Sequence, residues 1–246
     1  MSKSSSVFSY SIGKKLIMGI TGLFLISFLV VHLAGNLLLF KGAAEFNAYS
    51  EFMGHNPVIR TMEIVLFAGF LFHIVDGLML AAQNRKARPV QYAVQAGSKN
   101  STLFSRIMPH TGIIMLVFLI LHLVSFFVHA RFGVDVGYEG ADAAKYAVSN
   151  LGQAPETIGL DAEMTWSPYH KAQALFSITW YSIFYIVAMA VISFHLLHGF
   201  QSAFQTLGFR HKKYFPLIQT VGLGYAILIP AAFAAIPVYF LINPIG

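Results

Sequence analysis

The sequence contains no cysteine. This absence excludes disulfide bonds, haem attached covalently through a C-x-x-C-H motif, and iron–sulfur clusters held by cysteine. Any cofactor bound to this chain must therefore use histidine, methionine or oxygen ligands.

Charged residues are also scarce, at 11% of the 246 residues, compared with roughly 25% in an ordinary soluble domain. Five stretches have almost no Asp, Glu, Lys or Arg, and each reaches the roughly 20 residues that a helix needs to cross a bilayer. A helix satisfies its own backbone hydrogen bonds within hydrocarbon, so we expect an all-α membrane protein with a single transmembrane domain, 1–246. The predicted helices are at about 15–40, 58–84, 106–130, 171–208 and 215–242.

Acidic residues are missing from the segments in which basic residues gather. The N-terminus, the 85–106 connection and the 210–213 connection hold eleven of the sixteen Lys and Arg residues and none of the ten acids. Cytoplasmic loops are enriched in Lys and Arg, which predicts a cytoplasmic N-terminus and an external C-terminus. The net charge of +6 therefore reflects membrane topology and does not indicate nucleic-acid binding.

Two pairs of predicted helices carry matching motifs. Residues 21–33 read TGLFLISFLVVHL and residues 111–123 read TGIIMLVFLILHL, so both have Thr-Gly, nine residues, then His-Leu. Residues 72–83 read FHIVDGLMLAAQ and residues 194–205 read FHLLHGFQSAFQ, so both have Phe-His, three residues, then Gly. The first helix therefore resembles the third, and the second resembles the fourth.

Each of the first four helices contains one deep histidine: His32, His73, His122 and His195. Polar groups in hydrocarbon need partners, so an intramembrane histidine indicates function, although a hydrogen bond to a neighbouring helix carbonyl is the simpler alternative. Haem needs two axial nitrogens on opposite faces of its ring, and two helices that each offer one histidine meet this requirement. The four residues predict a bundle of the first four helices that binds two b-type haems.

Depth in the membrane sorts the histidines into pairs. His32 and His122 lie equally far after their Thr-Gly motifs, roughly 24 Å from the cytoplasmic helix ends, whereas His73 lies roughly 18 Å from Arg85. We therefore expect His32 to pair with His122, and His73 to pair with His195. His198 competes for the fourth position, but the repeat favours His195.

Small residues beside His73 and His195, the pair nearer the cytoplasmic side and here called the inner pair, indicate space for a flat ring. Gly77 and Gly199 each lie one turn after a deep histidine.

These motifs resemble those of the dihaem cytochrome b anchors of the succinate:quinone oxidoreductases, in their single-chain, five-helix form. The resemblance covers essentially the whole chain, and its carriers are Gly22-x9-His32, FLFHIVDG with His73, Gly112-x9-His122 and His195-x3-Gly199-x8-Gly208. It implies that His32 and His122 ligate a distal haem, and that His73 and His195 ligate a proximal one. Family members that move protons have Glu two residues before the fourth ligand; Ser193 stands there, so the resemblance does not extend to that pathway.

The resemblance implies a function in a bacterial inner membrane. The chain would anchor a flavoprotein subunit and an iron–sulfur subunit on its cytoplasmic face and pass electrons to menaquinone or ubiquinone. It has no flavin-binding glycine fingerprint, so it would not oxidise succinate by itself. The direction of turnover, the quinone species and assembly as a dimer of heterotrimers stay open.

Residues around these cofactors are predicted from charge and position. Haem propionates are negative, and the basic candidates at the inner helix ends are Lys14, Lys15, Arg85 and Arg106. Outer candidates are Arg60 and Trp166. A quinone site needs an apolar slot with a few polar groups, and the outer candidates for it are Asn36, Asn47, Glu51 and His55.

Other classes of membrane protein are less consistent with the pattern. The nearest alternative is the cytochrome b anchor of a nitrate reductase or a hydrogenase, which is built on the same principle and differs from this sequence in its motifs. A quinol:cytochrome c type cytochrome b stacks two ligands on one helix about four turns apart, which no helix here does. A transporter would show midplane charges and inverted repeats, whereas the repeats here run parallel and Asp76 is the one midplane acid.

Overall fold

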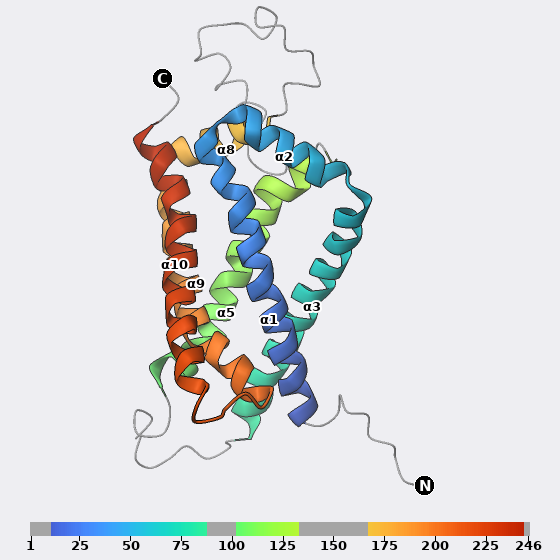
Figure 1. Cartoon of the computed structure of the whole chain (residues 1–246), viewed down its shortest axis with the longest axis vertical. Helices are drawn as coiled ribbons and strands as arrows, with labels where there is room; N and C mark the ends of the chain where they lie inside the picture. Colours follow the sequence, from blue (N-terminus) through green and yellow to red (C-terminus); the bar gives the residue numbers. More distant parts are fainter. Residues whose placement is uncertain (1–10, 88–101, 133–166, 244–246) are drawn as a thin grey trace, which may run out of the picture. The chain divides into compact units, whose positions relative to one another are not determined.

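The computed structural model describes residues 11–87, 102–132 and 167–243, and Figure 1 shows the helices that they form. These ranges contain helices and no strand. The segments that are long and apolar enough to cross a membrane are Ile12–Lys41, Pro57–Lys86, Leu103–Phe132, Thr179–Thr206 and Phe215–Ile242. The expected all-α membrane fold with five spanning helices is confirmed.

The first connection is itself helical, which the sequence analysis did not predict. Helix α1 (Ser11–Asn36) continues as the 3-10 helix η2 (Leu37–Lys41). Gly42 then turns the chain with a φ of 114°, a conformation that favours glycine, and helix α2 (Ala43–His55) follows. The residues between the first two spans therefore form an ordered helix rather than an irregular loop.

Helix α3 (Pro57–Lys86) begins with a local capping arrangement that its sequence encodes. The Asn56 side chain accepts hydrogen bonds from the backbone N–H groups of Val58, at 2.9 Å, and Ile59, at 3.3 Å. Pro57 occupies the first helical position, where its missing N–H group has no consequence.

The third span changes its helical type directly after its deep histidine. Helix α5 (Leu103–His122) passes into the π-helix η3 (Leu123–Val128) and then into α6 (His129–Phe132). The sequence predicts a start at about residue 106, whereas α5 begins at Leu103, where Thr102 accepts a hydrogen bond from the N–H of Ser105. Short π-helical segments frequently mark functional positions.

The fourth predicted helix, 171–208, is two helices. Helix α8 (Pro168–Ser177) is capped by Ser167, and α9 (Thr179–Thr206) follows. Ile178 is extended, and the hydroxyl of Ser182 donates to the carbonyl of Phe176 at 2.5 Å across the break. Figure 1 shows α8 beside α2, where the amide of Asn47 donates to Ser167 Oγ at 2.8 Å.

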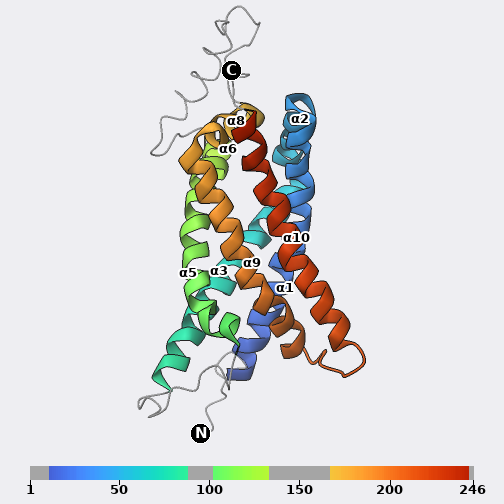
Figure 2. The ribbon, with the colours of Figure 1, turned by 90° about the vertical axis from the view of Figure 1, so that its left-hand side faces the viewer.

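The chain divides into two compact units, and every long helix contributes to both. Unit 1 comprises 1–30, 61–116 and 191–229, and unit 2 comprises 31–60, 117–190 and 230–246. Helix α10 (Phe215–Ile242) is joined to α9 by the short connection 207–214, visible in Figure 2.

Each unit has its own packing. In unit 1, the hydroxyl of Tyr225 on α10 donates to the Ile26 carbonyl of α1 at 2.5 Å, and Phe200 packs over Gly222. Unit 2 has an aromatic core whose buried members are Leu39, Ala172, Leu175, Phe176, Tyr181, Tyr185, Ile236 and Phe240.

The predicted topology can be tested by cysteine labelling, because the natural chain has no cysteine. With a cytoplasmic N-terminus, α2 lies outside and the connection 207–214 lies inside. In right-side-out membrane vesicles, we expect a membrane-impermeant maleimide to label a Glu45→Cys variant. A Lys212→Cys variant should react only after the vesicles are permeabilised, and the opposite pattern would reverse the orientation.

Candidate functional site

Each unit contains one of the histidine pairs that the sequence analysis expected. In unit 1, His73 on α3 faces His195 on α9, with ring centroids 6.4 Å apart and ring planes at 69°. In unit 2, His32 on α1 faces His122 at the end of α5, with centroids 5.9 Å apart and planes at 86°. The structure therefore brings together the pairs that depth in the membrane suggested.

The spacing of each pair matches two imidazoles that bind opposite sides of one metal ion. With metal–nitrogen distances of about 2 Å, and each ring centroid roughly 1 Å beyond its nitrogen, the centroids would be about 6 Å apart. Within the described ranges, no group of three or more His, Cys, Asp or Glu side chains is placed to hold a metal. Each pair thus offers two ligands only, which fits a metal whose remaining ligands come from a planar macrocycle such as haem.

The inner pair, His73 and His195, is supported by the repeated Thr-Gly motif. Thr21 Oγ1 lies 3.2 Å from Nδ1 of His73, and Thr111 Oγ1 lies 3.1 Å from Nδ1 of His195. A Cβ atom on the glycine that follows each threonine would lie 3.5 Å and 3.7 Å, respectively, from Cε1 of the same two imidazoles. The repeat is visible in the sequence, but the role of its threonines is not.

Gly77 and Gly199 were expected to make space for the cofactor. In this structure, each lies next to a methionine. A Cβ atom on Gly77 would lie 3.4 Å from Cε of Met18, and one on Gly199 would lie 3.9 Å from Cε of Met108. Both methionines lie three residues before the threonine of the Thr-Gly motif, which extends the repeat to Met-x2-Thr-Gly. The α1–α3 contact is therefore equivalent in sequence to the α5–α9 contact.

The outer pair, His32 and His122, has different neighbours. Nδ1 of His122 lies 3.3 Å from the hydroxyl of Tyr185, which accepts a hydrogen bond from Tyr181 at 3.0 Å. The amide nitrogen of Asn36 lies 3.4 Å from Nδ1 of His32 and donates to the His32 carbonyl at 2.8 Å. Asn36, which is a candidate for the quinone site, therefore lies next to His32.

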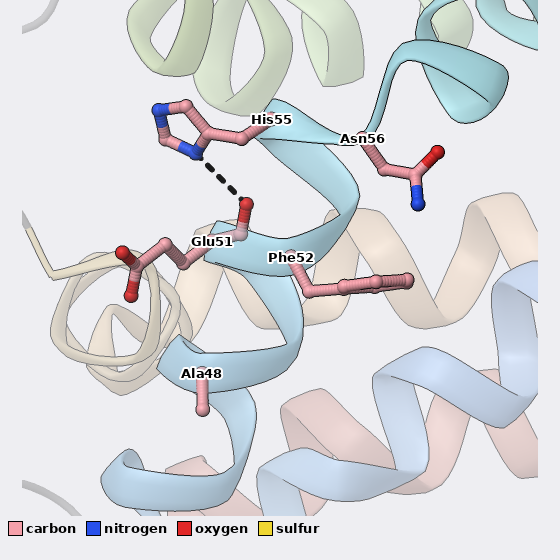
Figure 3. A pocket seen from close by; sticks show the side chains of 5 residues that line it. All are labelled: Ala48, Glu51, Phe52, His55 and Asn56. Carbon is pink, nitrogen blue, oxygen red and sulfur yellow. Dashed lines mark hydrogen bonds between the residues drawn. The ribbon is translucent and has the colours of Figure 1, made fainter.

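Two of the other three quinone candidates, Glu51 and His55, line a hollow at the surface of unit 2. Its volume is about 350 Å³, and its lining residues, shown in Figure 3, are Ala48, Glu51, Phe52, His55 and Asn56. Nδ1 of His55 lies 2.9 Å from the backbone carbonyl of Glu51, so its N–H donates there and leaves Nε2 as an acceptor. Asn47 does not line this hollow, because its side chain bonds Ser167 and the backbone N–H of Tyr169.

The basic residues that are candidates for binding haem propionates lie at helix ends. Lys15, Arg85 and Arg106 are exposed, and Lys14 is half-buried and close enough to Asp76 to interact with it electrostatically. Asp76 is 7% exposed, and its Oδ2 has no hydrogen-bond partner within the described part of the chain. Arg60 is exposed at the start of α3, and Trp166 lies outside the described residues.

The structure thus combines five helices that are long and apolar enough to cross a membrane with two facing pairs of histidines on those helices. The chain is similar to the succinate dehydrogenase cytochrome b558 subunit of Bacillus subtilis (strain 168). The two are 26% identical over 206 residues, which cover 80% of this chain and 84% of that protein. No protein-family model and no solved structure matches the chain significantly. The similarity to the Bacillus subtilis protein confirms the resemblance to the cytochrome b anchors of succinate dehydrogenase.

The hydrogen bonds of Tyr185 lead to a prediction about stability. A Tyr185→Phe substitution removes one oxygen and leaves both the Tyr181 hydroxyl and Nδ1 of His122 without this partner. We expect the free energy of unfolding in detergent to fall by about 1–3 kcal/mol. Tyr181→Phe is the control, since it leaves the Tyr185–His122 contact in place, and a larger loss in that variant would contradict the prediction.

Proposed function

We propose that this chain is the membrane anchor and electron-transfer subunit of a succinate:quinone oxidoreductase and that it binds two b haems. The observation that carries the proposal is the presence of two facing histidine pairs in a relative of a cytochrome b558 subunit. His32 and His122 would ligate the distal haem, and His73 and His195 the proximal one. Nδ1 of His73, His195 and His122 each lies near a hydroxyl oxygen of a threonine or tyrosine.

When bound, haem supplies one-electron transfer at its iron. One histidine pair would hold the iron of each haem, and the surrounding apolar helix surfaces would keep water away from it. Around the outer pair these surfaces are aromatic: Phe118 and Phe126 lie against His122, and Phe233 lies against His32. Lys14, Lys15, Arg85 and Arg106 would bind the propionates of the proximal haem, and Arg60 those of the distal haem.

The distribution of charge supports a peripheral partner on one face of the membrane. Eleven of the sixteen basic residues lie in the N-terminus and the two connections on the predicted cytoplasmic side. This face would bind the iron–sulfur subunit, with the flavoprotein beyond it, in a bacterial inner membrane. Without cysteine ligands or a flavin fingerprint, the chain depends on these partners for succinate oxidation.

The hollow next to α2 would bind the head group of menaquinone or ubiquinone. It joins an aromatic side chain, Phe52, to two groups that exchange protons, Glu51 and His55. Nε2 of His55 and the Glu51 carboxyl group would pass protons to the quinone oxygens during quinone reduction and accept protons from the quinol hydroxyls in the reverse direction. Asn36, which lies beside His32, also stays a candidate for quinone binding.

The haem ligands can be tested by removing them one at a time. We expect the purified protein to contain two non-covalent protohaems with low-spin, bis-imidazole absorption spectra. His32→Ala and His122→Ala should remove the same haem, and His73→Ala and His195→Ala the other, because the two ligands of one iron act together. Haem extraction and reduced-minus-oxidised spectra provide the measurement.

His198→Ala is the matched control for this series, since His198 lies three residues after His195 on the same helix. We expect both haem spectra to persist in this variant. Loss of different haems in His32→Ala and His122→Ala would overturn the pairing, and extraction of a single haem from the natural chain would overturn the haem count.

The quinone site can be tested separately with electron acceptors. In the assembled complex, Glu51→Gln and His55→Ala should lower quinone reduction by roughly 100-fold, a loss typical of removing a proton-transfer group. Succinate oxidation with a soluble artificial acceptor should be unchanged, because that acceptor bypasses the membrane. Glu45→Gln, another exposed acid on α2, is the control, and an equal effect of all three variants would refute this site.

A further inference from the structure

We infer that Thr21 and Thr111 are positioning residues for the inner pair, His73 and His195. Their hydroxyl oxygens accept the Nδ1–H groups of the imidazoles and so direct both Nε2 atoms toward one metal. The inference rests on the proposed ligation of a haem by this pair and adds two side chains that determine how strongly the ligands bind.

The direction of each hydrogen bond follows from the threonine's own partners. A hydroxyl has one proton. Thr21 donates it to the backbone carbonyl of Ile17, at 2.8 Å, and Thr111 donates it to that of Met108, at 3.0 Å. Toward the histidines, each oxygen can therefore only accept, which places the proton of both imidazoles on Nδ1. Nε2 is then unprotonated and carries the lone pair that a metal needs.

The arrangement occurs twice with the same parts, so it does not depend on one local contact. In both cases a threonine in Met-x2-Thr-Gly bonds back to its own helix and faces a histidine in Phe-His-x3-Gly on another helix. In both cases the next residue is a glycine, at the carbon between the two ring nitrogens. The threonine oxygen and the ring edge are therefore held in the same register at both sites.

The hydroxyl should affect the electronic properties of the ligand as well as its position. An acceptor on Nδ1–H makes the opposite nitrogen more basic, and such partners typically change metal affinity by 10–100-fold. A more basic axial nitrogen stabilises the oxidised, more positive iron. The two threonines should therefore lower the midpoint potential of the haem that His73 and His195 hold.

The outer pair lacks this device, so the effect should be confined to one haem. Nδ1 of His122 faces the phenol of Tyr185, and Nδ1 of His32 faces the amide of Asn36. Neither group is a hydroxyl that has already donated its proton to its own helix backbone, as Thr21 and Thr111 have.

The test compares Thr21→Val and Thr111→Val with Thr→Ser at the same positions, in the full-length protein loaded with haem. Each Val variant should raise the midpoint potential of the inner haem in an absorbance-monitored redox titration and weaken its binding by roughly 10-fold or more. The Ser variants should restore both values, and the outer haem should not change. Thr→Ala variants carry the same comparison if valine prevents assembly.

Thr206→Val is the matched control, because Thr206 makes the same kind of bond to its own helix, to the Ser202 carbonyl at 2.7 Å, on an exposed surface. It should leave both potentials unchanged. A shift as large as that of Thr21→Val, or no rescue by serine, would overturn the positioning role.

His73→Ala separates failure of this inference from failure of the proposed function. If that variant keeps both haems, the proposed ligation is wrong, and the positioning role is wrong with it. If it loses one haem while Thr21→Val and Thr111→Val keep the natural potential and affinity, the ligation stands and only the positioning role is refuted.

Discussion

The structure depends on one constraint, which is that an imidazole in hydrocarbon has two polar nitrogens and no water to bind them. In each deep histidine the two nitrogens face different surroundings. Nδ1 lies near another side chain of the protein. The ring also faces a second imidazole, and the two ring centroids are about as far apart as in two imidazoles that bind one metal ion.

The repeated motifs acquire a physical meaning from this constraint. In each Thr-Gly pair, the threonine supplies a hydrogen-bond acceptor and the glycine leaves room for the imidazole ring. The methionine of the same motif lies next to the glycine of the Phe-His-x3-Gly motif on the neighbouring helix. A flexible, apolar side chain can adapt to whatever lies next to it. The same short motif therefore solves the same problem at His73 and at His195.

The sequence predicted the spanning helices and the histidine pairs because both can be counted along the chain. The length of an apolar run indicates a spanning helix, and the number of residues to the helix end indicates the depth of a histidine. It did not predict α2, since a helix of 13 residues next to a membrane surface has no long apolar run. The break at Ile178 was also missed, because the hydrogen bond from the Ser182 hydroxyl to the Phe176 carbonyl across it leaves no compositional signal. Thr21 and Thr111 were visible only as a repeat, and their role required the distance to a histidine on another helix.

The π-helix directly after His122 separates two requirements along one span. A π-turn contains one residue more than the α-turn that it replaces, so the residues after Val128 are rotated without any change before Leu123. Beyond it, Arg131 donates to the Gly54 carbonyl at 3.1 Å, at the end of α2. Deleting one residue from η3 would keep His122 in register and turn Arg131 away by about 100°. The part of the span that carries His122 and the part that carries Arg131 are therefore oriented independently of each other.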